Sequence, residues 1–125
     1  MFGISLNDRQ PIHEQVTTRI TQLVLSGAIE PQSPLPSVRE LAAELGVNPN
    51  TIQRAYSELE RVGVTYSVNG KGRFVTDDVE RVRKAKIEEQ KRLFRNEVKK
   101  LKDLGASEEE AIAEVREVYE KGDGR

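Results

Sequence analysis

LPSVRELAAELGVNPNTIQRAYSELER, residues 35–61, decides the fold, because it holds two helix start signals on either side of a short turn. Ser37 is a favoured N-cap, and Glu40 three residues later completes a capping box. Gly46 can leave this first helix at positive φ. Asn48 then caps a second helix that opens on proline, whose missing N–H costs nothing there. Two short helices joined in this way are typical of a helix-turn-helix, which lays its second helix in the major groove of DNA.

The second helix separates an apolar stripe from a polar face. Its apolar residues recur with a helical period and are Ile52, Ala55, Tyr56, Leu59 and Val62. Its first turn carries amides, a hydroxyl group and a guanidinium, which are the groups that pair with base edges. Helix pairs with a glycine turn also occur in all-α cores, but this polar face favours DNA binding. The candidate DNA-binding residues are Asn48, Asn50, Thr51, Gln53 and Arg54, joined by Ser37 and Arg39 of the first helix.

A β-hairpin is predicted directly after the second helix, in residues 64–76, VTYSVNGKGRFVT. Its Asn69-Gly70 dipeptide is the strongest short-range signal for a hairpin turn. A hairpin in this position is the wing of a winged helix. Lys71, Gly72 and Arg73 are candidate DNA-binding residues at its tip, because glycine lets the neighbouring cations approach the sugar-phosphate backbone closely.

The register of this hairpin depends on the length of its loop. A two-residue Asn-Gly loop would pair Tyr66 with Arg73 and mix polar and apolar side chains on each face. A three-residue Asn-Gly-Lys loop instead collects the apolar residues on one face, namely Val64, Tyr66, Val68 and Phe74. Because a slip of one residue moves every side chain to the opposite face, we expect the three-residue loop.

Four ordered motifs, PIHEQV, LPSVRELA, VNPNTIQRAYSELE and GKGRFV, resemble the GntR family of bacterial transcription regulators, and the short C-terminal part resembles its YtrA-type branch. The resemblance covers residues 1–76. His13 stands where an aromatic residue is usual, Gln32-Ser33 replaces a common glycine, and Arg73 replaces a small hydroxyl residue. The last departure bears on how the wing sits on DNA.

This resemblance implies a winged-helix repressor whose DNA binding responds to a ligand or signal and which often governs a transporter operon. It also implies that Arg39 and residues 48–53 are DNA contacts and that the short helical tail is the dimerisation element.

A further helix is predicted before the motif, from Pro11 to Gly27, with the apolar stripe Ile12, Val16, Ile20, Leu23 and Val24. It would cover the other two helices and complete a three-helix core. Before it, Phe2, Ile4 and Leu6 alternate as a short strand or an apolar arm. The fold class is therefore mainly α with a small β wing. We predict a winged helix-turn-helix DNA-binding domain in residues 1–76 and a helical dimerisation tail in residues 77–125.

The tail is predicted to form two helices with a short link. One runs from Asp77 to about Leu104, and Ser107 with Glu110 starts the other with a second capping box. Residues 81–102 hold ten Lys and Arg against three Glu, whereas residues 107–120 hold six Glu against one Arg. These charges form either two solvated faces or an antiparallel pairing of the two helices, within one subunit or between subunits.

The tail has more apolar residues than a solvent-exposed surface usually carries, but too few to form a hydrophobic core by itself. Pairing with a second copy of the chain is the simplest resolution. The predicted interface residues are Ile87, Phe94, Val98, Leu101, Ile112, Val115 and Tyr119.

Composition argues against several other classes of protein. A net charge of −1 means that any DNA affinity comes from a localised face. The absence of cysteine excludes disulfides and thiolate metal sites. With one histidine and neither a metalloprotease motif nor a complete phosphate-binding loop, we expect no enzyme activity, catalytic residue, metal or cofactor. Neither a spanning apolar run nor a signal peptide is evident, so a cytoplasmic protein without a membrane partner is expected.

Two points stay open at the level of sequence. A winged-helix adaptor that docks proteins through the basic segment 81–102 is the alternative function, although it gives no reason for the polar face around Gln53. The expected partners are a double-stranded DNA operator and a second copy of the chain. The existence and identity of a small-molecule effector are left open.

Overall fold

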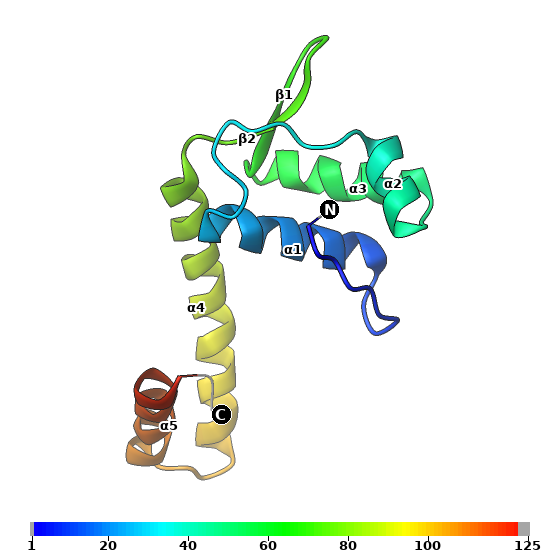
Figure 1. Ribbon diagram of the computed structural model, residues 1–125. Coiled ribbons are helices and arrows are strands. Elements are labelled where there is room, and N and C mark those ends of the chain that lie inside the picture. Colours follow the sequence, from blue (N-terminus) through cyan, green and yellow to red (C-terminus); the bar gives the residue numbers. More distant parts are fainter. Residues whose placement is uncertain (1, 123–125) are drawn as a thin grey trace. The chain divides into compact units, whose positions relative to one another are not determined.

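The computed structural model describes residues 2–122, which contain five helices and one two-stranded sheet (Figure 1). In chain order these are α1 (Ile12–Ser26), α2 (Val38–Leu45), α3 (Pro49–Arg61), β1 (Thr65–Val68), β2 (Gly72–Val75), α4 (Val79–Asp103) and α5 (Glu108–Lys121). The chain divides after Lys84 into two compact units. The expected class, mainly α with a small β wing, is confirmed.

The start of each helix in the helix-turn-helix follows from its capping residue. The Ser37 hydroxyl accepts a hydrogen bond of 3.1 Å from the Glu40 backbone N–H, and the Glu40 carboxylate accepts one of 3.1 Å from the Ser37 N–H. The side-chain oxygen of Asn48 accepts from the backbone N–H of Asn50 at 2.7 Å. Gly46 ends α2 with φ at +69°, a conformation that glycine adopts without strain. The predicted capping box and N-cap are therefore confirmed.

The core of the first unit lies where α1 and α2 pack against α3. In Figure 1, α1 runs alongside α3, and the hairpin projects from the C-terminal end of α3. The residues that are almost completely removed from solvent are Val16, Ile20, Val24, Leu41, Ile52, Tyr56, Leu59, Val64 and Val75. Each buried Val, Ile or Leu side chain stabilises the fold by roughly 1.5–3 kcal/mol. All the residues of this cluster belong to the first unit, which therefore has a hydrophobic core of its own.

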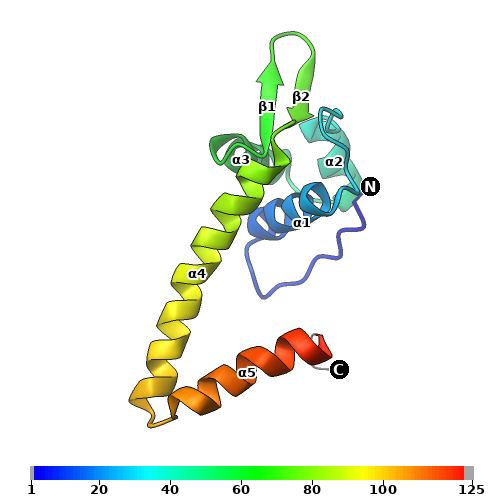
Figure 2. The same cartoon turned by 90° about the vertical axis from the view of Figure 1, so that its left-hand side faces the viewer.

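The wing has the register that the three-residue loop predicts (Figure 2). Tyr66 lies opposite Phe74, and their rings stack with centroids 5.9 Å apart. This aromatic pair is not buried, since Tyr66 stays 39% exposed. The strand residues that enter the core are Thr65 and Val75, which oppose each other nearer to α3. The register was thus predicted correctly, but of the predicted apolar face only Val64 is fully buried, while Tyr66 and Val68 stay exposed.

The segment just before the helix-turn-helix pairs with β2 in the manner of a short third strand. The backbone N–H of Leu35 donates to the carbonyl oxygen of Arg73 at 2.9 Å, and that of Gln32 donates to Val75 at 2.8 Å. The Val75 N–H donates in turn to the Ser33 carbonyl at 2.9 Å. β2 is therefore hydrogen-bonded on both sides, by β1 and by residues 32–35.

The N-terminal residues form an arm rather than a strand. Phe2 and Ile4 are half-buried against the core, and the guanidinium of Arg19 donates to the Phe2 carbonyl at 3.1 Å. The reciprocal bonds between Asn7 and Gln15, of 3.0 and 2.8 Å, fix the arm to the first turns of α1.

The first turns of α4 belong to the first unit. Val82 is buried in its core, and the first unit therefore continues beyond residue 76, where the sequence changes composition. The Arg83 guanidinium donates to the Leu25 carbonyl at the C-terminal end of α1 at 2.8 Å, which suits the negative end of a helix dipole. Arg81 donates to the Gly63 carbonyl at 3.0 Å. The predicted helix start at Asp77 is displaced slightly, because Asp78 accepts from the Arg81 N–H.

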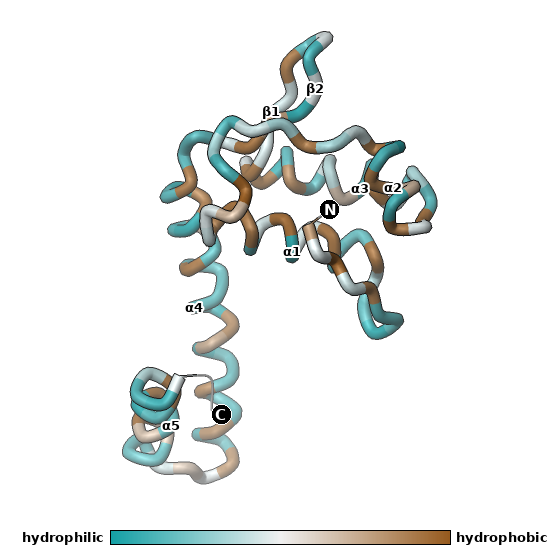
Figure 3. The backbone as a smooth tube through the Cα atoms, viewed as in Figure 1, coloured by the Kyte–Doolittle hydropathy of each residue, from teal (hydrophilic) through white to brown (hydrophobic). Residues whose placement is uncertain are grey.

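The second unit consists of the remainder of α4 and of α5, separated by a turn at Gly105 with φ at +96°. Ser107 and Glu110 form the predicted capping box at the start of α5. Figure 3 shows apolar residues recurring along α4 between hydrophilic ones. No residue of α5 is buried, and Phe94 of α4 is 52% exposed. Within its described residues this unit has no buried apolar core.

Candidate nucleic-acid interface

The N-terminal half of α3 presents polar side chains to solvent. Asn48, Asn50, Gln53 and Arg54 are exposed, and Thr51 is half-buried. The buried residues of the same helix lie on its other side, because Ile52, Ala55, Tyr56 and Leu59 recur at helical spacing. The structure therefore brings the five predicted residues, the N-cap Asn48 and four residues of α3, together on one solvent-facing segment.

Gln53 is oriented by a neighbour on its own helix. Its side-chain amide donates to the hydroxyl group of Ser57, one turn later, at 3.2 Å. The bond uses one N–H and leaves the amide oxygen free to accept. Ser57 was not predicted as a site residue, although its spacing of four residues from Gln53 could have indicated it.

The start of α2 contributes Ser37 and Arg39, both exposed. Ser37 supplies the cap described above, so its hydroxyl oxygen is already engaged within the helix. The pKa of Glu40 is lowered, first by the Ser37 backbone N–H and then by the Ser37 hydroxyl, because both stabilise the carboxylate. Arg39 stands two residues after this cap, in the first turn of α2.

The wing places its two cations differently. Lys71 and Gly72 are exposed at the tip, where the Lys71 backbone N–H closes the turn onto Val68 at 3.0 Å. Gly72 has φ at +106°, which L-residues rarely adopt. Arg73 is half-buried, and its guanidinium carbon lies 5.3 Å from the centroid of the Tyr56 ring. The three residues are adjacent in sequence, but only Lys71 and Gly72 lie at the tip.

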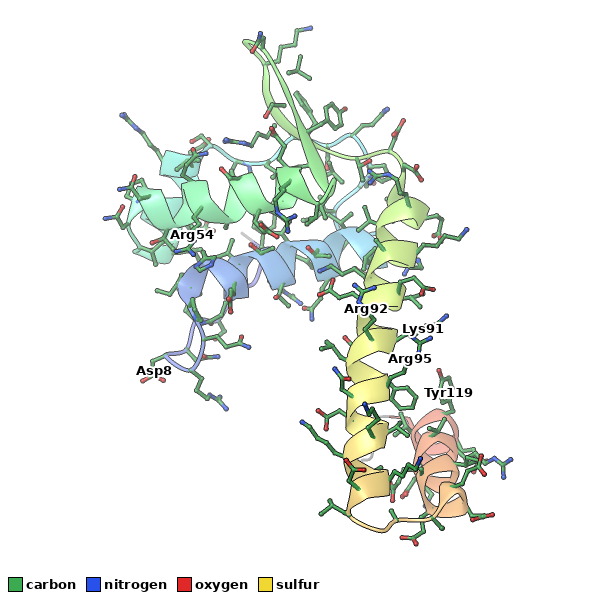
Figure 4. The ribbon with its side chains drawn as sticks, turned by 180° about the vertical axis from the view of Figure 1, so that it is seen from behind. Asp8, Arg54, Lys91, Arg92, Arg95 and Tyr119 are labelled. Carbon is green, nitrogen blue, oxygen red and sulfur yellow. The ribbon has the colours of Figure 1, made fainter. Side chains whose placement is uncertain are left out.

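A polar groove of about 570 Å³ lies between α1 and α3. Figure 4 shows Arg54 on α3 next to α1, and Arg54 is one of the residues that line this groove. The lining residues are Gln10, His13, Glu14, Thr17, Thr18, Arg54, Ser57, Glu58 and Arg61. The bidentate pair between Arg61 and Glu58, at 2.9 and 2.6 Å, lies on its wall. Arg54 thus connects the polar face of α3 with the groove.

The predicted interface residues of the tail all lie in the second unit and none is buried. The exposed fraction of their side chains ranges from 38% at Val115 to 87% at Tyr119 among the exposed members, and Val98 is half-buried. They are Ile87, Phe94, Val98 and Leu101 on α4 and Ile112, Val115 and Tyr119 on α5. Figure 4 labels Tyr119 on α5 and the cations Lys91, Arg92 and Arg95 on α4.

Residues 2–122 contain no group of three or more His, Asp or Glu side chains that could hold a metal ion. No helix in this range is both long enough and apolar enough to cross a membrane.

A three-helix core, an exposed polar face at the start of its third helix and a hairpin wing define a winged-helix DNA-binding protein. The family of bacterial regulatory proteins known as gntR matches residues 12–75, so the chain belongs to the GntR family. It is a DNA-binding transcriptional regulator and not an enzyme, and the resemblance stated from its motifs is confirmed.

Two relatives from Bacillus subtilis extend this comparison. The chain is 36% identical to the uncharacterised transcriptional regulator YhcF over 113 residues, which covers 90% of this chain and 93% of YhcF. It is 40% identical to the transcriptional repressor YtrA over 78 residues, which covers 62% of this chain and 60% of YtrA.

Two solved structures share the fold. A GntR family transcriptional regulator from Listeria monocytogenes superposes with a TM-score of 0.74 at 39% identity, over 90% of this chain and 99% of that one. The DNA-binding domain of AraR, in complex with its operator ORX1, superposes with a TM-score of 0.53 at 31% identity, over 58% of this chain and 93% of that domain.

Proposed function

We propose that this protein is a homodimeric repressor that reads a pseudo-palindromic operator through α3 and its wing. The observation that carries the proposal is the solvent-facing group of amide, hydroxyl and guanidinium side chains at the start of α3. A helix with these groups can form bidentate hydrogen bonds with adenine and guanine in the major groove. The AraR domain, which shares the fold of part of this chain, is bound to an operator.

The proposal gives each part of the surface a separate task. Asn50, Thr51 and Gln53 would select bases, because amides and hydroxyl groups pair with base edges. Arg39 and Arg54 would contact phosphates or guanines. Asn48 and Ser37 would present helix N-termini, whose free N–H groups attract phosphate. Lys71 and Gly72 would bring the wing tip onto the sugar-phosphate backbone.

Dimerisation is proposed for residues 77–125, and DNA binding for residues 1–76. The support is the exposed apolar surface of the second unit, where Phe94, Leu101, Ile112 and Val115 are each more than a third exposed. Exposed apolar groups on these two helices favour association, because covering them releases hydration water and lowers the free energy. A second copy of the chain is the partner that a two-fold operator requires.

The charges of the second unit fit either of the pairings that the sequence left open. Several lysines of α4 pair with glutamates of the same helix, as Lys91 does with Glu88 at 3.3 Å and Lys100 with Glu97 at 3.1 Å. Such exposed pairs contribute well under 1 kcal/mol each. The apolar residues, rather than the charges, are therefore proposed to hold the subunits together.

Two further parts of the proposal rest only on the resemblance to the GntR family. These are control of a transporter operon and a response to a small-molecule effector. Because its target is bacterial DNA, the regulator is proposed to act in the cytoplasm.

The test is selection of duplexes from a random library by the purified full chain at about 150 mM salt, where weak non-specific binding is suppressed. We expect enriched duplexes with two related half-sites, whose centres lie about 10 bp or a multiple of that apart. Sedimentation of the protein with and without the enriched duplex gives the stoichiometry. A single half-site bound by one chain would contradict the dimer, and no enrichment would contradict sequence-specific binding.

A further inference from the structure

The inner face of the wing meets α3 at two contacts that lie side by side. On the wing, Ser67 and Arg73 are directly opposite each other in the strand register. On α3, Tyr56 and Glu60 are four residues apart, so their side chains lie one above the other on the helix surface. The Ser67 hydroxyl donates to the Glu60 carboxylate, and the Arg73 guanidinium lies over the Tyr56 ring. One cross-strand pair thus rests on one pair of helix residues.

The partner of Arg73 is itself held rigidly. The Tyr56 side chain is fully buried, and its hydroxyl group donates to the Pro36 carbonyl at 2.9 Å. The backbone carbonyl of Arg73 accepts from the Leu35 N–H at 2.9 Å, which fixes the strand on the same side. The Tyr56 ring is therefore a fixed surface against which the planar guanidinium of Arg73 can stack.

The environment of Arg73 differs from that of an exposed phosphate ligand. Its Nε atom is buried and has no hydrogen-bond partner within the described residues. A buried donor without a partner lowers the stability of the fold. That this side chain nevertheless occupies the position indicates that it makes another contribution there. Lys71, two residues earlier, is exposed at the tip.

We propose that Arg73 is a positioning residue, which locks the wing onto α3 through Tyr56 so that the wing tip and the polar face of α3 meet DNA as one rigid surface. Its contribution to binding is orientation of the wing, and the charge that neutralises a phosphate comes from Lys71. This inference rests on the proposed DNA-binding function, because it concerns the same surface.

The test compares Arg73→Met with Lys71→Ala in the full chain, using a duplex obtained by selection with the wild-type protein. Methionine keeps the aliphatic stem of arginine and removes its planar charge. We expect Arg73→Met to weaken binding by between about threefold and thirtyfold, the range that a cation–π contact spans. Lys71→Ala should make the slope shallower by about one, as the loss of one phosphate contact does.

The double variant supplies a second readout. If Arg73 positions the wing, Lys71→Ala should cost less affinity in the Arg73→Met background than in the wild type, because the displaced tip has already lost its contact. Hydrogen exchange without DNA should become faster at the amides of β1 and β2 in Arg73→Met, while those of α1 stay protected. Thermal unfolding checks that all variants fold.

Two results would overturn the inference. They are additive effects of the two substitutions, with a salt slope that becomes shallower by about one for each of them, and unchanged hydrogen exchange in the wing. A wild-type protein that enriched no duplex would instead contradict the proposed function, and the hydrogen-exchange comparison would still decide whether Arg73 holds the wing.

Discussion

The hydroxyl group of Tyr56 donates a hydrogen bond of 2.9 Å to the carbonyl oxygen of Pro36, and so joins the buried side of α3 to the residue just before the cap of α2. Ser37, the next residue, starts α2. The bond therefore fixes the angle at which the chain enters the helix-turn-helix, independently of the turn at Gly46.

Tyr56→Phe removes this bond and keeps the ring. We expect the free energy of unfolding to fall by about 1–2 kcal/mol, because one hydrogen bond is lost and a carbonyl is left without its partner. Urea denaturation followed by circular dichroism measures the change. Tyr66→Phe is the matched control, since the Tyr66 side chain is 39% exposed, and it should be nearly neutral. A Tyr56→Phe protein as stable as the wild type would show that the bond is dispensable.

Tyr56 should also make the fold sensitive to alkali. Burial raises the pKa of Tyr56 above its usual value of about 10, because the phenolate would lose its hydration. Unfolded chains release this proton near pH 10 and folded ones only at higher pH. Stability should therefore fall above about pH 10, by up to roughly 1.4 kcal/mol per pH unit from this group. Urea midpoints at about pH 9 and 11 should differ less in Tyr56→Phe than in the wild type. Equal differences would contradict the expectation.

Gln53→Ala tests the reading of bases by α3. The proposed function predicts relaxed specificity at one or two base pairs, with each lost contact worth roughly 1–3 kcal/mol. Selection with the variant, followed by binding to single-base variants of the duplex, measures it. Ser57→Ala removes the partner that orients the Gln53 amide and should give a smaller change at the same position. If Gln53→Ala changes neither the preferred sequence nor the affinity, α3 does not read these bases.

Phe94→Asp tests the proposed subunit interface. A carboxylate buried without a partner costs several kcal/mol, so the dimer should dissociate and operator binding should fall toward non-specific levels. Sedimentation and gel-shift assays on one preparation measure both effects. Leu104→Asp makes the same change at an apolar residue outside the predicted stripe, with a side chain 84% exposed, and should leave the dimer intact. A dimeric Phe94→Asp protein with normal operator binding would remove this residue from the interface.

Gly63→Ala tests the contact between α4 and the start of the wing. Gly63 has φ at +82°, and an added Cβ would lie 2.6 Å from Nη1 of Arg81. Gly70→Ala is the control, because Gly70 has φ at +77° with no atom within 4 Å of the added carbon. In both variants the free energy of unfolding should fall by about 1–2 kcal/mol, because alanine is strained in the left-handed conformation. Gly63→Ala should lose about 0.5–1.5 kcal/mol more, because Arg81 is displaced from the Gly63 carbonyl.

The double variant Gly63→Ala/Arg81→Ala should no longer show this additional loss relative to Arg81→Ala alone. Thermal or urea unfolding of the set provides the comparison. Equal losses in Gly63→Ala and Gly70→Ala would show that the Arg81 side chain moves aside without cost.

Features that depend on a few neighbouring residues were predictable from the sequence. The caps at Ser37, Asn48 and Ser107 are short-range hydrogen bonds, and the loop after Val68 fixes the wing register within seven residues. The face that the wing turns toward α3 was not predictable. It depends on where β1 leaves α3, and the structure turns Thr65 and Val75 inward instead of the aromatic pair.

The same limit applies to the candidate site. The residues of α3 share a surface because helical spacing puts them there, as their polar side chains indicated. The position of Arg73 depends on Tyr56, seventeen residues earlier in the chain, and on the path of β2. Sequence spacing alone placed it at the wing tip beside Lys71, since nothing local distinguishes the two cations.

Hydrogen bonding of β2 on both sides has a consequence for the order in which the chain folds. Residues 32–35 and 73–75 are about forty positions apart, so the wing cannot be completed by its own turn at Asn69 and Gly70. Closing that loop costs chain entropy before the contacts it brings are gained. The wing should therefore form late, together with the three-helix core rather than as an independent hairpin. In a ribosome-bound chain, both helices of residues 35–61 can form before β2, which pairs with residues 32–35, has been synthesised.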